Sequence, residues 1–345
     1  MKRSLLLAGS ALLLMAITIS CKDVIKVTDV TLIQTAFTLP VGETEILIAT
    51  VHPEDATQKE VSWVSDNPEV ASVVNGLVTA LKEGTAKITV TTREGKKKAS
   101  CFIEICKYVE GEPQMIIVDG GTFTMGCTRN FGNECHECEF PRHSVTVSSF
   151  SIGKYPITQK QWEVFTGKTI LEQAVLAGTT KLYGVGDNYP VYYVSWDDAQ
   201  VFIENLNAAT GKNYRLATEA EWEFAASGGT KSNYYRYSGS NKIDEVAWYT
   251  DNSNMTSQPV GTKQPNELGI YDMSGNVREW CYDWYALYSS DFHQTNPQGP
   301  TWGQMRIARG GSWRYAHFYC RVSDRFYAYP ETCNLNSGFR VALSL

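Results

Sequence analysis

The sequence predicts a multidomain protein, with an all-β sandwich at the N-terminus and a larger mixed α+β domain that is poor in regular secondary structure. Short runs of β-branched residues separated by turn residues fill residues 24–107, and helix-start signals appear only further along. Eight of the nine tryptophans and all the tyrosines lie beyond residue 107. A length of 345 residues allows two domains of roughly 100–200 residues each. The apolar fraction of 43% excludes disorder of the whole chain.

The first segment, residues 1–21, is predicted to be an export signal. Lys2 and Arg3 precede an almost entirely apolar and small stretch that ends at Cys21, and this stretch is shorter than the ~20 residues that a transmembrane helix needs. It is similar to a bacterial lipoprotein signal, which implies lipidation of Cys21, although residues 18–20 depart from the usual pattern. The alternative is an ordinary cleaved signal with an incidental Cys21. We expect a membrane-anchored lipoprotein of the bacterial cell envelope, at the outer membrane or surface.

Composition and motifs exclude several functional classes. The formal charge of −6 argues against a nucleic-acid partner, because such proteins normally carry a basic stripe. Five histidines without an HExxH motif exclude the commonest zinc-protease signature. The sequence has no GxGxxG motif at a strand–helix junction and no GxxxxGK[ST] motif, so nothing in it supports nucleotide chemistry.

Residues 24–107 are predicted to form the sandwich. Seven strands are expected at 33–39, 44–51, 59–64, 70–74, 77–80, 86–92 and 98–105. The segment resembles a bacterial Ig-like domain of group 2, through pieces that include LPVG at 39–42, VSWVS at 61–65 and GTAKITV at 84–90. Trp63 is expected to be the core tryptophan. The resemblance implies a spacer or adhesion module, and the spacer is favoured.

Residues 108–113 are a polar linker, and three helices are predicted in the domain that follows, at 114–345. Thr158 caps the first helix. Ser195 and Thr218 each open a capping box, with a helix that ends near Gly211 in one case and at Gly228 in the other. The abundance of aromatic residues between these helices predicts irregular chain held by large side chains.

The larger domain resembles the formylglycine-generating enzyme family, also called sulfatase-modifying factor. The matching blocks run in order along the domain and include VDGGTFTMG at 118–126, YRLATEAEWEFA at 214–225, NELGIYDMSGNVREW at 266–280, RGGSW at 309–313 and GFRVA at 338–342. The resemblance implies a variant of the C-type lectin fold. It also implies an oxidase that converts a sulfatase cysteine to formylglycine, with oxygen and a copper(I) ion held by two thiolates.

One of the two copper-ligand positions departs from the family pattern. Cys320 occupies the second position, but Tyr315 occupies the first. A phenol is a hard oxygen donor and a poor ligand for soft Cu(I). We therefore expect a domain without the copper dithiol that acts as a surface binding or scaffold protein. The alternative is an oxidase with an altered metal site that retains Cu(I), in which Cys281, Cys333 or His317 would have to complete the coordination.

Export favours disulfides among the remaining cysteines, but their pairing does not follow from the sequence. Cys135 and Cys138 have CxxC spacing, and a disulfide from Cys127 to either of them is favoured over a zinc site. Cys281 is the proposed partner of Cys320 if Cys320 is oxidised.

The resemblance also implies a structural calcium site. Asp272 and Glu279 would supply side-chain oxygens, and Gly275 and Val277 would supply carbonyl oxygens. The alternative makes Asp272 a turn former and Glu279 an ion-pair partner. The family's other calcium site is not expected, because Val246 stands where a polar side chain is needed.

The partner is predicted to be an unknown surface protein or a glycan, with the membrane contacted only through the lipid anchor. Exposed tyrosines such as Tyr234, Tyr235, Tyr285 and Tyr288 would stack on sugars, although core packing explains most aromatic residues in such a domain.

Overall fold

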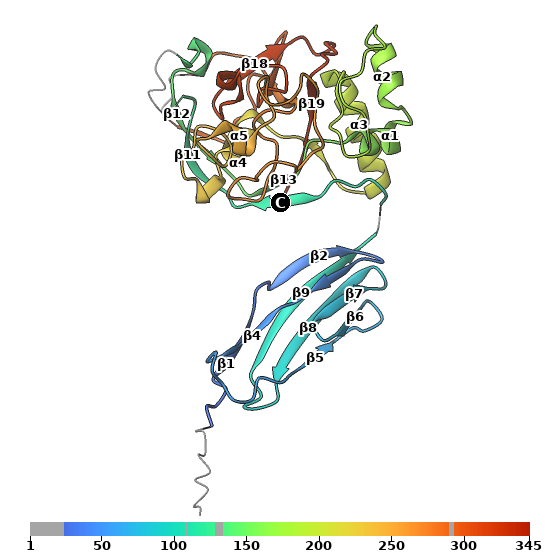
Figure 1. The fold of residues 1–345 in the computed structure, drawn as a ribbon, viewed down its shortest axis with the longest axis vertical. Helices are drawn as coiled ribbons and strands as arrows, with labels where there is room; N and C mark the ends of the chain where they lie inside the picture. Colours follow the sequence, from blue (N-terminus) through green and yellow to red (C-terminus); the bar gives the residue numbers. More distant parts are fainter. Residues whose placement is uncertain (1–23, 108, 128–133, 290–292) are drawn as a thin grey trace, which may run out of the picture. The chain divides into compact units, whose positions relative to one another are not determined.

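The computed structural model describes residues 24–107, 109–127, 134–289 and 293–345, so the lipidation candidate Cys21 lies outside the described residues. The chain divides into two compact units, Met1–Tyr108 and Val109–Leu345 (Figure 1). None of the helices in the described ranges combines the length and apolarity that a membrane span requires.

The N-terminal unit is a β-sandwich, as predicted. Its strands are β1 (Asp29–Leu32), β2 (Ala36–Pro40), β3 (Thr44–Ile46), β4 (Ala49–His52), β5 (Val61–Ser65), β6 (Ala71–Val74), β7 (Leu77–Ala80), β8 (Gly84–Thr92) and β9 (Lys98–Cys106). They form sheets in the orders β2-β9-β8-β5, β3-β7-β6 and β1-β4. Strand β1 was not predicted, and the expected strand over 44–51 divides into two strands with different partners, because β3 pairs with β7 and β4 pairs with β1.

The core of this unit consists of two apolar clusters, and the predicted core tryptophan packs against both. Trp63 is half-buried between the cluster around Ile88 and Ile103 and the cluster around Val30 and Val90. Alternating burial along β8 places every second side chain inside, as expected for a sheet with one covered face.

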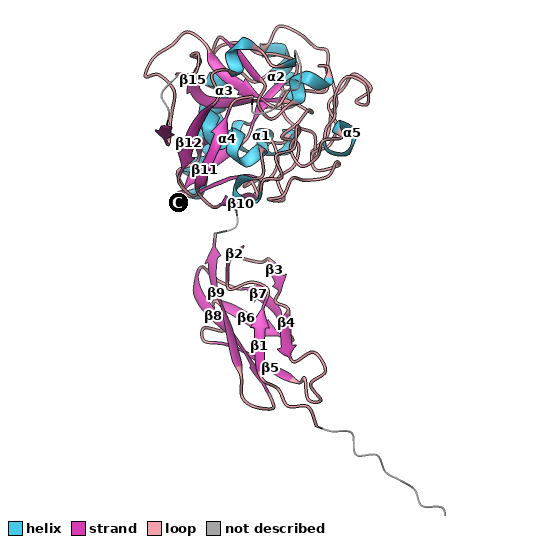
Figure 2. Ribbon diagram, turned by 90° about the vertical axis from the view of Figure 1, so that its left-hand side faces the viewer, coloured by secondary structure: helices cyan, strands magenta, loops and turns pink. Residues whose placement is uncertain are grey.

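The described residues of the C-terminal unit form three small sheets. Much of the chain between them is irregular (Figure 2). The sheets have the orders β10-β13-β20-β14, β11-β12-β16 and β18-β17-β15-β19. Their strands are β10 (Met115–Val118), β11 (Gly121–Met125), β12 (His143–Val147), β13 (Phe150–Gly153), β14 (Arg215–Leu216), β15 (Arg278–Trp284), β16 (His293–Thr295), β17 (Arg306–Arg309), β18 (Arg325–Ala328), β19 (Ser337–Phe339) and β20 (Val341–Ser344).

The three predicted helices are present with the predicted caps. They are α1 (Gln159–Thr166), α3 (Trp196–Thr210) and α4 (Glu219–Ala226), capped by Thr158, Ser195 and Thr218. Two further helices, α2 (Ile170–Leu176) and α5 (Ile243–Val246), were not predicted, although Thr169 and Glu172 give α2 the same capping-box signal.

Aromatic side chains fill the core of the C-terminal unit, as the composition predicted. Trp162, Phe202 and Phe339 contact one another with ring centroids 5.2–6.4 Å apart, and all three are buried. Helix α4 carries Trp222 and Phe224 into a second cluster. This cluster fixes α4 against β15 and β17, the strands that lead into the segments described next.

Candidate functional site

A tight turn directly after β17 brings the backbone up against Cys320. Gly310 and Gly311 both have positive φ angles, +93° and +67°. A Cβ on Gly311 would lie 2.7 Å from the Cys320 Sγ and 2.5 Å from the Tyr319 carbonyl oxygen. The turn therefore requires glycine for its backbone conformation and also for the space that the Cys320 thiol occupies.

Cys320 is a fully buried thiol at the end of the short 3-10 helix η4 (His317–Cys320). It packs with Tyr237, Val246 and Tyr249 in a small apolar cluster. Burial raises the pKa of Cys320 to about 12, and Asp324 adds to this effect, against the backbone amides of Ser312 and Gly275 that favour the thiolate. The thiol is therefore protonated at neutral pH.

Tyr315 is held by an arginine. The Arg278 guanidinium carbon lies 3.9 Å from the centroid of the Tyr315 ring and 3.7 Å from that of Phe326. Arg278 is 3% exposed, and its burial lowers its pKa. The Tyr315 ring is therefore part of a cation–π stack at the end of the glycine turn.

Neither proposed sulfur partner is bonded to Cys320. Cys281 and Cys333 are free thiols, and Cys281 belongs to a different apolar cluster, so the suggested Cys281–Cys320 disulfide is wrong. His317 packs its ring on Phe318, with centroids 5.5 Å apart. Two groups of three potential metal ligands occur among the described residues, and neither includes Cys320.

Three of the predicted calcium ligands lie on the turn before β15 and Glu279 lies in β15 itself, and the two carboxylates have different partners. Asp272 Oδ2 accepts a hydrogen bond from the Gly261 amide at 2.7 Å. Burial raises the pKa of Asp272 to about 6, which marks a carboxylate whose charge the surrounding protein compensates poorly. Glu279, in contrast, accepts two bonds from Arg340 and one from Trp222, at 2.6–2.7 Å.

Of the two predicted carboxylate ligands, only Asp272 has an environment that suits a hard cation. Asp272 offers a buried oxygen that a cation would stabilise, and Gly275 permits the close backbone, since a Cβ there would lie 2.3 Å from the Trp248 carbonyl oxygen. Arg340 already neutralises Glu279. The calcium site remains a prediction.

The comparisons with known proteins identify both domains. Residues 106–345 match the sulfatase-modifying factor enzyme 1-like domain, and residues 26–103 match the bacterial Ig-like domain of group 2. The chain belongs to the sulfatase-modifying factor family. Both resemblances inferred from the sequence motifs are thereby confirmed.

Relatives of this sulfatase-modifying factor chain include proteins that are named for different functions. Chaperone protein LppX of Paenibacillus barcinonensis is 34% identical over 252 residues, which cover 58% of this chain and 78% of LppX. The formylglycine-generating enzyme of Thermomonospora curvata is 29% identical, over 66% of this chain and 92% of that enzyme. The structure of Treponema denticola variable protein 1 is similar with a TM-score of 0.57 and 26% identity, covering 72% of this chain and 96% of that one.

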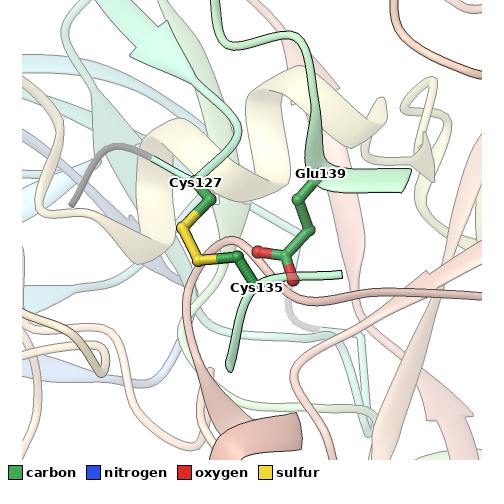
Figure 3. Close-up of side chains that lie close together, drawn as sticks. All are labelled: Cys127, Cys135 and Glu139. Atoms are coloured by element: carbon green, nitrogen blue, oxygen red, sulfur yellow. A yellow bond between two sulfur atoms is a disulfide. The ribbon is translucent and has the colours of Figure 1, made fainter. Parts of the chain in front are cut away.

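A disulfide links two cysteines of the sulfatase-modifying factor domain, and it is one of the two pairings that the sequence predicted for Cys127. Cys127 and Cys135 are bonded, beside the carboxylate of Glu139 (Figure 3). Cys138 is a free thiol. Since two of the sulfurs are covalently joined, this cluster does not provide the four ligands of a structural zinc site.

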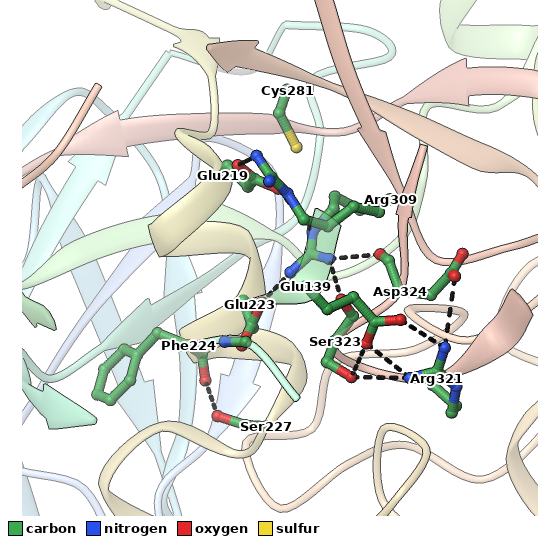
Figure 4. A network of polar contacts seen from close by, with 12 residues as sticks. Glu139, Glu219, Glu223, Phe224, Ser227, Cys281, Arg309, Arg321, Ser323 and Asp324 are labelled. Carbon is green, nitrogen blue, oxygen red and sulfur yellow. Dashed lines mark hydrogen bonds and ion pairs between the residues drawn. The ribbon is translucent and has the colours of Figure 1, made fainter. Parts of the chain in front are cut away.

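Buried arginine–carboxylate pairs form a network that the sequence reasoning missed (Figure 4). Arg321 bonds both oxygens of Glu139 at 2.7 Å, and Ser323 donates to the same carboxylate. Arg309 pairs with Glu223 on α4. All of these ionic side chains are at most 4% exposed, so each charge depends on its partner.

A concave surface of the sulfatase-modifying factor domain is lined by residues of β11 and of the segment that follows α4. A cavity of about 890 Å³ is lined mostly by hydroxyl side chains, together with Arg142 and Arg236. Tyr234 and Tyr235 stand at this cavity with exposed fractions of 68% and 37%. Of the four tyrosines predicted to contact sugars, these two are exposed, whereas Tyr285 stacks on Tyr327 and Tyr288 packs on His143.

Proposed function

We propose that this protein is an exported lipoprotein, anchored through Cys21, whose sulfatase-modifying factor domain binds a surface protein or glycan and does not generate formylglycine. The observation that carries the proposal is the state of Cys320. Its thiol is sealed from solvent and protonated, and the expected position of its partner thiolate is occupied by Tyr315, which stacks on Arg278. The β-sandwich would act as a spacer.

The energetic argument concerns ionisation of the thiol. Copper(I) binds thiolates, and two are needed for its usual near-linear coordination. With a pKa of about 12, ionising Cys320 at pH 7 costs about 7 kcal/mol, at roughly 1.4 kcal/mol for each pH unit. A bound copper ion would have to supply this energy through a single sulfur ligand. It would also have to reach a thiol that is buried among aromatic rings and has no contact with solvent.

The alternative function, an oxidase with an altered metal site, has one observation in its favour. The backbone of Ser312 and Gly275 lowers the pKa of Cys320 and so favours its thiolate form, against the effect of burial. The altered site would need a second donor beside them.

A copper titration separates the two functions. We expect no stoichiometric Cu(I) binding by the reduced chain, and the same result for the matched Cys320→Ser variant. A Tyr315→Cys variant that gains copper affinity would show that the missing thiolate is the limiting group. Binding of one equivalent by the unmodified chain, lost in Cys320→Ser and accompanied by oxygen-dependent conversion of a sulfatase-motif cysteine peptide, would refute the proposal.

The partner is proposed to bind at the cavity beside Tyr234 and Tyr235. Exposed aromatic faces and surrounding hydroxyl groups suit either a sugar or a polypeptide. The name of the relative LppX, a chaperone protein, supports a role in binding protein. A Tyr234→Ala/Tyr235→Ala variant should lose capture of the partner from envelope extracts, whereas Tyr329→Ala, which removes another exposed ring, should retain it.

We also infer a structural Ca²⁺ next to Asp272. Its support is the buried, poorly compensated carboxylate, since oxygen donors with uncompensated charge favour a hard cation. Calcium should raise the melting temperature of the unmodified chain and leave that of Asp272→Asn unchanged. Equal melting curves with calcium and with a chelator would contradict the inference.

The anchor is tested separately. We expect radiolabelled palmitate to be incorporated into the chain when it is expressed in bacteria, and not into Cys21→Ser. Equal labelling of both would exclude lipidation at Cys21.

A further inference from the structure

A second, smaller cavity in the C-terminal unit has a carboxylate in its wall that lacks an ionic partner. The cavity measures about 340 Å³, within the range of small-molecule sites. Its wall combines apolar and aromatic side chains, and six of them are Met125, Trp284, Leu287, Tyr288, Pro297 and Pro300. Asp283 also lines it and is only 4% exposed.

One oxygen of Asp283 has a clear structural role. Oδ2 accepts a hydrogen bond of 2.8 Å from the amide of Glu219, the first residue of α4. A carboxylate at this position satisfies an amide that has no partner within the helix. Capping explains one oxygen of the side chain.

The other oxygen, Oδ1, has no such explanation. No residue in the described part of the chain donates a hydrogen bond to it, and it is not among the buried polar atoms that are sealed without a partner. A Cβ built on Gly299 would lie 3.3 Å from Oδ1. Since position 299 carries no side chain, none covers Oδ1 from that side.

The buried arginines around the cavity make their close contacts with groups other than Asp283. Arg325 bonds both oxygens of Glu219, at 2.7 and 2.8 Å, and Arg309 pairs with Glu223. Two arginines are therefore held by two glutamates, a third, Arg306, stacks on Trp196 and Trp284 with its guanidinium carbon 3.8 and 3.5 Å from the ring centroids, and no ion pair within the described ranges includes Asp283. A buried carboxylate without a cation is unfavourable unless it is protonated or a ligand supplies the charge.

We propose that this cavity binds an alkyl ammonium group, with the ammonium at Asp283 Oδ1 and the alkyl chain against the aromatic and proline side chains. An ammonium donates up to three hydrogen bonds, which suits a single open carboxylate oxygen, and its methylene chain suits the apolar wall. The source is either a lysine side chain of a partner polypeptide or a free alkyl amine. The site does not depend on whether Cys320 binds copper.

Binding is linked to pH through Asp283. Burial and the neighbouring carboxylate of Glu219 raise the pKa of Asp283 to about 8, so the side chain is mostly protonated at pH 6 and mostly ionised at pH 9. The other titratable or charged groups near the carboxylate or on the cavity wall are Glu221 on α4, Cys281 on β15, Arg306 on β17, Arg325 on β18, His143 on β12 and Tyr288. Alkyl ammonium ions keep their charge over this range.

The test is a titration of the full chain with n-butylammonium, followed by ligand-observed NMR at constant ionic strength. We expect saturable binding that strengthens by more than about tenfold between pH 6 and pH 9, and no binding of n-butanol, which has the same chain without the charge. Affinity that is independent of pH in the unmodified chain, or equal binding of n-butanol, would overturn the proposal.

Matched variants locate the ligand. Asp283→Asn preserves a carbonyl oxygen for the α4 amide and should weaken butylammonium binding by about tenfold or more, the usual effect of losing a charged hydrogen bond. Asp251→Asn removes an equal charge from an exposed position and should bind like the unmodified chain. Unchanged affinity in Asp283→Asn would refute the site.

The source of the ammonium is distinguished with a second probe. A short acetylated peptide with one central lysine should compete with butylammonium if the natural ligand is a lysine side chain. Butylammonium binding without competition by the peptide supports a free amine. Either pattern supports an ammonium site, whereas absence of saturable butylammonium binding excludes both sources.

Discussion

Substituting Gly311 by alanine tests the contact between the glycine turn and the Cys320 thiol. Two costs add at this position. An alanine at φ +67° is in the left-handed region, which costs about 1–2 kcal/mol. Its Cβ would also lie 2.7 Å from the Cys320 sulfur and 2.5 Å from the Tyr319 carbonyl oxygen, and such overpacking typically costs about 1–3 kcal/mol. We expect the free energy of unfolding to fall by about 2–5 kcal/mol.

Gly167 provides the matched control. It has nearly the same φ angle, +69°, and no atom lies within 4 Å of a Cβ built there. Gly167→Ala should therefore lose only the conformational cost of about 1–2 kcal/mol. The difference between the two variants isolates the crowding at Cys320.

Tryptophan fluorescence during urea denaturation is a suitable assay, because eight of the nine tryptophans lie in the C-terminal unit and only Trp63 in the sandwich. The two units need not unfold together, so the transition reported by the eight tryptophans is the one to compare. Equal losses in Gly311→Ala and Gly167→Ala would refute the reasoning, since the turn would then need glycine only for its backbone angle.

Three further predictions concern buried charge and the disulfide. Glu139→Gln should lower the free energy of unfolding by about 3–5 kcal/mol in urea denaturation, because Arg321 would remain buried without a full counter-charge; a loss below 1 kcal/mol would contradict this. With a chelator present to remove calcium, ionisation of Asp272 should lower the free energy of unfolding by up to about 3 kcal/mol as the pH rises from 4 to 6, because the pKa of Asp272 is about 6 in the folded state and near 3.8 in the unfolded state. Asp272→Asn should therefore be more stable than the unmodified chain above pH 6 and not below pH 4, and equal pH profiles would be evidence against it. Replacing Cys127 and Cys135 by serine should cost about 2.5 kcal/mol, the loop entropy for a separation of eight residues, and an unchanged denaturation midpoint would contradict it.

Local signals predicted the sandwich strands other than β1 and three of the helices, but none of the strands of the C-terminal unit. The capping boxes at Ser195 and Thr218 need only residues three apart, so both helices were predicted with the correct first residue. The boundaries of the sandwich strands were less accurate, because pairing across the sheet decides them. Strand β1 exists through its register with β4, from Asp29 opposite His52, and its own short sequence does not show this.

The site was less predictable because its contacts join distant segments. Glu139 and Arg321 are 182 residues apart, and Glu223 and Arg309 are 86 apart. The arginines of β17 and β18 look like ordinary surface residues in sequence, since arginine is rarely buried without a partner. The position of Cys320 was inferred from the family motif, but its burial and its raised pKa depend on Tyr237 and Tyr249, which no motif includes.

The glycine turn and Cys320 pack directly against each other, and this bears on what the family motifs mean in this chain. Gly311 leaves room for the sulfur, and the sulfur fills the space next to Gly311. The pair is therefore explained by packing alone, so an RGGSW motif followed by one cysteine is a signature of the fold as much as of the oxidation. Tyr315 strengthens this argument, because its ring covers a buried Arg278 that would lose a cation–π contact if a small cysteine took its place. Restoring the dithiol by Tyr315→Cys should therefore lower stability while it raises copper affinity, and a variant that gains copper at no cost in stability would show that the tyrosine has no packing role of its own.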